Sequence, residues 1–202
     1  MSATPAALEV IVSRIHGAPA RLGPPTDPMR LVCIDGPAGS GKTSLAEQLM
    51  TRTGAQVVHM DDLYDGWGGL LDVHERLEGQ ILTPLAAGGA GRYQRYDWRA
   101  ERFTESVDVP RTPLLVIEGC GAGSRVVQPY LGLLIWVSAP DELRLRRGLE
   151  RDGKALEPQW RAFMADEQIL YSRERTPERA DLHLDAWGEL IAPGATARGE
   201  KP

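Results

Sequence analysis

The sequence has 202 residues and a mass of 22.1 kDa, the size of one domain that buries its own core without disulfides or structural metal. Its 42% hydrophobic and 25% charged residues indicate a soluble globular protein and exclude a disordered or collagen-like chain. The net charge of −5 argues against a protein that holds nucleic acid with its whole surface, but leaves a small anionic ligand open. The most apolar run, residues 131–139, is far shorter than the ~20 residues that cross a bilayer, and the N-terminus lacks a signal-peptide pattern. We therefore expect a cytoplasmic protein that binds neither nucleic acid nor a membrane.

Cysteine and lysine are rare in the chain. With two cysteines, Cys33 and Cys120, and no export signal, we expect free thiols rather than a disulfide. Lysine occurs only at Lys42, Lys154 and Lys201, while arginine carries most of the positive charge. Lys42 is therefore the single lysine of the first 153 residues, and it has either no particular role or a dedicated one.

Apolar patterns predict alternating strands and helices over most of the chain. Short apolar runs that end in loops predict strands at residues 31–34, 57–60, 114–117, 133–137 and 180–184. Helical spacing of apolar residues predicts helices at residues 4–16, 43–50, 70–82, 141–151 and 158–173, with a kink or a new helix start at Pro84. This alternation is typical of an α/β fold with a parallel sheet and helices on both faces, whose ligands gather at the carboxyl ends of the strands.

Other segments divide the chain. We expect residues 1–30 to form an N-terminal helix and a proline-rich linker, residues 31–192 the main domain, and residues 193–202 a disordered tail. Residues 93–98 follow a glycine-rich turn and are rich in aromatic and charged side chains, so we interpret them as a functional loop. His59 and His74 fall within apolar patterns, which favours packed core histidines over ligands.

A phosphate-binding motif follows the first predicted strand. Residues 36–43 read Gly-Pro-Ala-Gly-Ser-Gly-Lys-Thr and match the P-loop pattern G-x-x-x-x-G-K-[ST] between a strand and a helix. Glycines let backbone N–H groups surround phosphate oxygens, and the helix N-terminus adds partial positive charge. Lys42 would reach the β- and γ-phosphates, and Thr43 would bind Mg²⁺. We expect the nucleotide to bind Gly36, Ala38, Gly39, Ser40, Gly41, Lys42, Thr43 and Ser44.

The sequence also narrows the class of P-loop protein. It contains no asparagine, so it cannot carry the Asn-Lys-x-Asp motif by which guanine-specific switch proteins read their base. The predicted strand at residues 114–117 is followed by Glu118-Gly119. In motor and clamp ATPases the corresponding strand normally ends in an Asp-Glu pair, and the chain is longer. These features favour a small-molecule kinase.

Three further segments carry a family resemblance. The run Asp61-Asp62-Leu63-Tyr64, the Glu118-Gly119 pair, and Arg146-Arg147 followed by Arg151-Asp152 resemble elements of the uridine kinase and nucleoside/nucleotide kinase-like P-loop family. The resemblance covers roughly residues 31–185 and implies a parallel sheet of five strands. It also implies a catalytic base at Asp61, with Asp62 as the alternative. Arg147 and Arg151 would be lid arginines, which close over the phosphates. The metal would be held by Thr43, Asp61 and Glu118.

The resemblance extends to the binding of the phosphoryl acceptor. Tyr96-Asp97-Trp98 is similar to the family's Tyr-Asp-Phe element, although the histidine that follows in the family is replaced here by Glu101. Aromatic side chains can stack on a flat heterocycle. The acceptor-binding residues implied are Tyr64, Tyr93, Tyr96, Asp97 and Trp98.

Taken with the P-loop, these segments predict a kinase that uses ATP and Mg²⁺ to phosphorylate a hydroxyl group of a small molecule. A nucleoside is the leading acceptor. The alternatives are a sugar acid, a pantothenate-like acceptor or an antibiotic hydroxyl, and a regulatory ATPase that binds nucleotide without phosphorylating a substrate. The family resemblance also implies self-association into a homo-oligomer.

Overall fold

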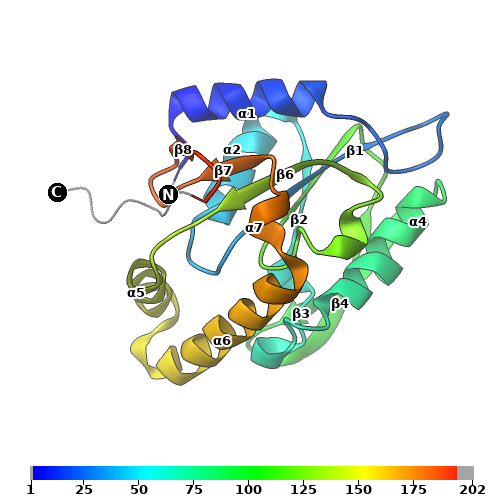
Figure 1. Cartoon of the computed structure of the whole chain (residues 1–202). Helices are drawn as coiled ribbons and strands as arrows, with labels where there is room; N and C mark the ends of the chain where they lie inside the picture. Colours follow the sequence, from blue (N-terminus) through cyan, green and yellow to red (C-terminus); the bar gives the residue numbers. More distant parts are fainter. Residues whose placement is uncertain (1, 195–202) are drawn as a thin grey trace.

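The computed structural model describes residues 2–194 and has a central sheet between two helical layers (Figure 1). The sheet contains β1 (Arg30–Asp35), β2 (Gln56–His59), β5 (Leu114–Glu118), β6 (Leu131–Val137), β7 (Leu182–Leu184) and β8 (Leu190–Ile191). Its strand order is β2-β5-β1-β6-β7-β8, and all neighbours are parallel except β7 and β8. The five predicted parallel strands are confirmed, and β8 adds a short antiparallel edge. Residues 195–202 of the predicted tail lie outside the described residues.

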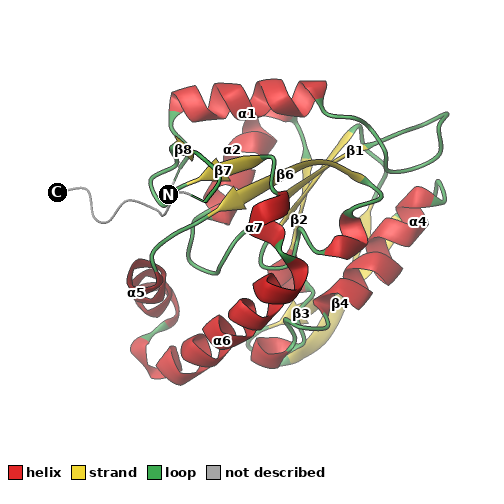
Figure 2. Cartoon of the chain, in the orientation of Figure 1, coloured by secondary structure: helices red, strands yellow, loops and turns green. Residues whose placement is uncertain are grey.

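Helices cover both faces of this sheet (Figure 2). One face carries α1 (Pro5–Gly17) and α2 (Lys42–Thr53), and the other carries α3 (Val73–Arg76), α4 (Thr83–Ala86), α6 (Glu157–Glu174) and α7 (Thr176–Arg179). Helix α5 (Asp141–Asp152) follows β6 and packs against α6. Among residues 2–194 no helix combines the length and the apolar character that a membrane span needs.

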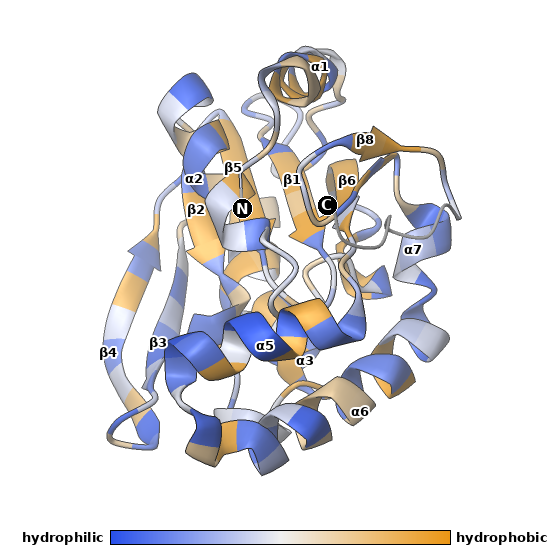
Figure 3. Ribbon diagram, turned by 90° about the vertical axis from the view of Figure 1, so that its left-hand side faces the viewer, coloured by the Kyte–Doolittle hydropathy of each residue, from blue (hydrophilic) through white to orange (hydrophobic). Residues whose placement is uncertain are grey.

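The core has two layers because side chains alternate along each strand. In β1, Val32 and Ile34 pack with α1 and α2, whereas Leu31 and Cys33 pack with the opposite layer. The central strands β1, β5 and β6 are apolar over most of their length, which is typical of a parallel sheet buried on both faces (Figure 3). Both cysteines are buried and free, as expected.

The helical stretch before the hairpin changes form near Pro84. A π-helical segment (Leu77–Leu82) joins α3 to α4, and Pro84 lies in the first turn of α4. Leu82 and Thr83 have helical backbone angles, so Pro84 lies within a continuous helical run, where it cannot donate a backbone hydrogen bond and the helix changes form. The predicted restart at Pro84 therefore takes the form of a π-helical segment followed by α4.

Interpretation of residues 93–98 as a loop is wrong for most of the segment. Strands β3 (Gly91–Asp97) and β4 (Arg102–Val109) form a separate antiparallel hairpin. Side chains alternate between buried and exposed from Gly91 to Gln94, and a register shift between Gln94 and Tyr96 then brings Tyr96 to the same buried side as Tyr93. The sequence pattern was missed because the inward side chains are aromatic and polar rather than a continuous apolar run.

Asp35, the last residue of β1, joins three segments beneath the P-loop. Its Oδ1 accepts hydrogen bonds from the backbone N–H groups of Gly36 and Gly121 over 2.7 and 2.9 Å, and from the Tyr171 hydroxyl over 2.9 Å. Its Oδ2 accepts from the Gly123 N–H over 2.8 Å. The side chain is fully buried. Asp35 therefore fixes the loop after β5 and helix α6 to the start of the P-loop.

We expect Asp35→Ala to lower the free energy of unfolding by about 3–5 kcal/mol, because it leaves four buried donors without an acceptor. Urea unfolding followed by circular dichroism measures this. The exposed Asp72→Ala is the control and should change the free energy of unfolding by no more than about 0.5 kcal/mol. Equal stability of the two variants would contradict the role of Asp35.

Candidate active site

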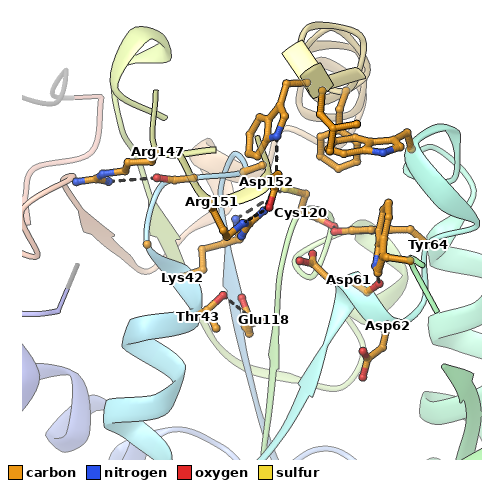
Figure 4. Close-up of a pocket in the computed structure, with 18 of the residues that line it drawn as sticks. Lys42, Thr43, Asp61, Asp62, Tyr64, Glu118, Cys120, Arg147, Arg151 and Asp152 are labelled. Atoms are coloured by element: carbon orange, nitrogen blue, oxygen red, sulfur yellow. Dashed lines mark hydrogen bonds and ion pairs between the residues drawn. The ribbon is translucent and has the colours of Figure 1, made fainter. Parts of the chain in front are cut away.

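A cavity of about 840 Å³ opens at the carboxyl ends of β1, β2 and β5 (Figure 4). This is the edge at which ligands of open α/β sheets bind. The P-loop and lid arginines line one part, and aromatic side chains line another. Its lining comprises Ala38, Gly39, Gly41, Lys42, Thr43, Ser44, Asp61, Asp62, Tyr64, Trp67, Trp98, Arg99, Glu101, Glu118, Cys120, Arg147, Arg151, Asp152, Leu156, Trp160 and Phe163.

The P-loop has the backbone of an anion cradle. Gly36, Gly39 and Gly41 have φ values of 145°, 78° and 109°, a region that side-chain-bearing residues rarely adopt. A Cβ on Gly36 would lie 2.1 Å from the Val137 carbonyl oxygen, so only glycine fits there. Helix α2 begins at Lys42, and the N–H groups of its first turn have no partners within the helix. These donors and the helix dipole fit a phosphate group.

Two P-loop side chains, those of Ser40 and Lys42, are buried, and Lys42 lines the cavity. The Ser40 hydroxyl is buried and has no hydrogen-bond partner among residues 2–194. Lys42 Nζ donates to the Pro37 carbonyl oxygen over 3.0 Å and lies 3.7 Å from Cys120 Sγ. Burial lowers the pKa of Lys42, but the acidic groups around it together raise it more, so the net shift is upward; they are Cys120, Glu118, Glu167 and Asp61. Lys42 is therefore a cation inside the cradle.

Thr43, Glu118 and His59 form a connected group at the ends of three elements. Glu118 Oε1 accepts a hydrogen bond from Thr43 Oγ1 over 3.1 Å and lies 2.6 Å from His59 Nδ1. The His59 side chain is 41% exposed, so the prediction of a packed core histidine is wrong. The register of β2 on β5 places His59 directly beside Glu118. This hydrogen bond is the main cause that raises the pKa of His59.

The chemistry of this group fits a magnesium ion that shares its ligands with a nucleotide. Between residues 2 and 194 no cluster of three or more His, Cys, Asp or Glu side chains is arranged to hold a metal by itself. Mg²⁺ commonly takes one or two protein oxygens and completes its shell with phosphates and water. The Thr43 hydroxyl and the Glu118 carboxylate supply oxygens of that kind beside the P-loop.

Asp61 and Asp62 follow β2 but differ in their surroundings. Asp62 Oδ2 accepts hydrogen bonds from the Tyr93 hydroxyl over 2.9 Å and from Arg95 Nε over 3.1 Å, so it binds the hairpin. In the described part of the chain no hydrogen-bond donor reaches the Asp61 carboxylate, which is open to the cavity although protein atoms crowd around it. Asp61 is exposed to the cavity, and desolvation by the surrounding cavity walls, followed by the Glu118 carboxylate, raises its pKa.

The two predicted lid arginines have different partners. Arg147 donates from Nη1 to the Gly39 carbonyl oxygen over 3.1 Å and from Nη2 to the Ala186 carbonyl oxygen over 3.3 Å. In Figure 4 its guanidinium points away from the aspartates. Arg151 instead pairs with Asp152, with Nε 2.7 Å from Oδ1. Both arginines line the cavity, and Figure 4 shows Arg151 nearer than Arg147 to Lys42 and Asp61. The charge of Arg151 lowers the pKa of Asp61.

An aromatic wall, formed by Trp67, Trp98, Trp160 and Phe163, lines the far part of the cavity. Trp67 contacts each of the other three edge-on, with ring centroids 5.5–6.0 Å apart. Trp98 is 39% exposed, and its Nε1 donates to the Asp61 carbonyl oxygen over 3.0 Å. Of these four residues only Trp98 was predicted, because the others come from segments with no recognisable motif.

The other residues predicted to bind the phosphoryl acceptor differ in whether they line the cavity. Tyr64 lines the cavity, and its hydroxyl donates to the Cys120 carbonyl oxygen over 2.8 Å. Tyr93 binds Asp62, and Tyr96 packs edge-on against Trp98 with centroids 5.2 Å apart. Asp97 accepts the N–H groups of the two residues at 99 and 100 and so closes the hairpin turn. The structure thus places Tyr93, Tyr96 and Asp97 behind the cavity wall as its support.

No known protein-family model matches the chain. Cytidylate kinase from Ignicoccus hospitalis is 28% identical over 147 residues, which cover 73% of this chain and 79% of that protein. Among solved structures, one described as a possible uridine kinase from Bacillus stearothermophilus has a TM-score of 0.66 at 19% identity and covers 89% of this chain and 98% of its own. D-glycerate 3-kinase from Cryptococcus neoformans has a TM-score of 0.54 at 14% identity, and the match covers 93% of this chain and 96% of the kinase chain. The chain therefore has the fold of the P-loop kinases, which confirms the resemblance expected from its motifs.

Proposed function

We propose that the protein is a phosphotransferase that moves the γ-phosphoryl group of ATP to a hydroxyl group of a small molecule. The observation that carries the proposal is one cavity lined by the P-loop cation Lys42 and by Asp61, a carboxylate open to that cavity. A nucleotide-binding protein without an acceptor needs the first feature but not the second. The likeness to cytidylate kinase, a possible uridine kinase and D-glycerate 3-kinase supports phosphoryl transfer to a small molecule.

Each group has a defined task in this reaction. The P-loop N–H groups and Lys42 bind and neutralise the phosphates, since phosphoryl transfer depends on positioning and on electrostatic stabilisation. Thr43 and Glu118 would hold Mg²⁺, which neutralises phosphate charge when bound. Asp61 accepts the proton of the attacking hydroxyl, for which its raised pKa is favourable. Arg151 adds positive charge from α5.

The acceptor is proposed to be an uncharged molecule with a flat ring, and a nucleoside fits this description. The aromatic wall offers ring faces and edges to such a molecule. Away from the P-loop and α5, the cavity is lined by the carboxylates of Asp61, Asp62 and Glu101 and by one cation, Arg99. This excess of negative charge disfavours an acceptor that already carries a phosphate or a carboxylate. The nucleotide that cytidylate kinase is named for, the sugar acid and the pantothenate-like acceptor are therefore less favoured than a nucleoside.

ADP formation from Mg²⁺-ATP over a panel of acceptors tests the proposal. The panel contains nucleosides, their monophosphates, glycerate, pantothenate and antibiotics with free hydroxyls, each compared with the rate without acceptor. We expect one or more nucleosides to raise the rate at least about tenfold, and their monophosphates to have little effect. A larger response to the monophosphates would contradict the uncharged acceptor. No response at all would favour the regulatory ATPase.

We expect Trp98→Ala to raise the KM for the acceptor by about 10- to 100-fold, because it removes an exposed ring that contacts Trp67 in the aromatic wall. The KM for ATP should change by less than about threefold, since the contacts of Trp98 described above are with Asp61, Trp67 and Tyr96 and not with the P-loop. Phe103→Ala is the matched control, because Phe103 packs on Tyr96 in the same hairpin but does not line the cavity. Equal effects of the two substitutions on the KM for the acceptor would show that only the hairpin fold matters.

A further inference from the structure

A buried charged pair, Glu167 of α6 and Arg144 of α5, has no role in the chemistry described so far. The two residues are 1% and 3% exposed. Arg144 Nη1 donates to Glu167 Oε2 over 2.7 Å, and Arg144 Nε donates to Asp141 Oδ1 over 3.0 Å. A buried ion pair is a weak stabiliser, because the cost of desolvating both charges offsets much of their attraction. Its position beside the nucleotide cradle therefore suggests a task other than stability.

The second oxygen of Glu167 contacts the P-loop itself. Oε1 accepts a hydrogen bond from the backbone N–H of Ala38 over 2.6 Å, and Cys120 Sγ lies 3.4 Å from the same oxygen. Hydrogen bonds to an ionised acceptor are shorter and stronger than neutral ones. The Ala38 N–H is thus held by a protein carboxylate instead of pointing to a phosphate, and the first half of the loop is fixed to α6.

Helix α5 is fixed to the same loop by close packing. A Cβ on Gly39 would lie 2.7 Å from the Arg144 carbonyl oxygen, so the backbone of α5 touches the P-loop directly. Arg147 lies three residues after Arg144, and Arg151 lies four residues after Arg147. These spacings place all three arginines on one side of the helix. The position of Arg151 at the cavity therefore depends on how Arg144 holds α5 against the loop.

We propose that Glu167 is a positioning residue that joins the P-loop, α5 and α6 into one unit, and that Arg144 cancels its negative charge beside the bound phosphates. This inference rests on the proposed function, because the phosphates are those of ATP. Without Arg144, the Glu167 carboxylate loses its ion-pair partner next to the cradle and repels the triphosphate. Without the charge of Glu167, a cation remains that attracts the triphosphate, but the Ala38 N–H loses its partner.

Binding of a non-hydrolysable ATP analogue with Mg²⁺, measured by calorimetry, tests this asymmetry. We expect Arg144→Met to weaken binding by about tenfold or more, and Glu167→Gln to change it by less than about threefold. The control is Glu157→Gln on the same helix, which breaks an exposed pair with Arg161 and should leave binding unchanged. Equal losses in the Arg144 and Glu167 variants, or no loss in either, would overturn the proposal.

A second measurement separates positioning from stability. Glu167→Gln keeps the side-chain volume but has one acceptor oxygen in place of two, so it cannot accept from both Ala38 and Arg144. We expect faster exchange of the Ala38 amide hydrogen, and a kcat lowered about tenfold with less than a threefold change in the KM for ATP.

The double variant Arg144→Met with Glu167→Met completes the test. Replacing a buried pair by apolar residues of similar volume often preserves stability, so we expect a parent-like melting temperature together with a low kcat. A folded double variant with the parent kcat would overturn the positioning role. If the double variant fails to fold, the single variants decide. If the parent phosphorylates no acceptor, the proposed function fails, whereas analogue binding and Ala38 exchange still test this inference.

Discussion

Lys42→Ala should lower the rate of phosphotransfer by about 10²- to 10³-fold, because it removes the cation that the P-loop brings to the phosphates. Lys42 is buried in the cradle and its pKa is raised, so it stays charged, whereas the other cations of the cavity, Arg147 and Arg151, come from α5 and not from the P-loop. The rate of phosphorylated product formation under saturating acceptor measures the effect. The fold should persist, because Lys42 has one hydrogen bond to a backbone carbonyl and a weaker sulfur contact.

Lys154→Ala is the matched control for this experiment. Lys154 lies in the short turn between α5 and α6 and outside the cavity lining. Its removal changes the net charge of the protein by the same amount, so it accounts for any general electrostatic effect. Activity of Lys42→Ala within threefold of Lys154→Ala would contradict the assignment of the P-loop as the phosphate site.

Asp61→Asn should lower kcat by about 10²- to 10⁴-fold while the affinity for ATP stays within about threefold of the parent. The amide has the size of the carboxylate but does not accept the hydroxyl proton. Single-turnover kinetics with bound ATP measure the chemical step directly. A loss of ATP affinity equal to the loss of rate would instead mark Asp61 as a nucleotide or metal ligand.

Asp62→Asn is the comparison that separates the two candidate bases. Asp62 binds Tyr93 and Arg95 of the hairpin, so its replacement should loosen the hairpin and raise the KM for the acceptor, with kcat lowered by less than about tenfold. If Asp62→Asn loses more of kcat than Asp61→Asn, the base is Asp62 and the assignment is reversed.

Much of the fold could be predicted from local patterns. The five parallel strands were visible because each is a short apolar run that ends in a loop, and the P-loop because its glycines serve a backbone conformation that few sequences adopt. The hairpin was missed because β3 and β4 carry aromatic and charged side chains on a small exposed sheet, where alternation is hard to distinguish from a loop.

The site could be predicted only where a motif marks it. Trp67 and Trp160 lie in segments far apart in the sequence, and only the tertiary packing of α6 brings their rings together. Glu167 sits among polar and apolar residues of a long helix, where no spacing distinguishes a buried carboxylate from a solvated one. His59 was misread because it ends an apolar strand, while its role depends on the register of that strand with Glu118.

The most direct test of the account is the ratio of phosphorylated acceptor to ADP, measured by mass spectrometry and chromatography after incubation with Mg²⁺-ATP and the best nucleoside of the panel. Transfer from ATP to the acceptor hydroxyl yields one phosphorylated nucleoside for each ADP, and both products should disappear together in Lys42→Ala and in Asp61→Asn. ADP released without phosphorylated nucleoside, at a rate that Asp61→Asn leaves unchanged, would contradict the account and identify a nucleotide hydrolase.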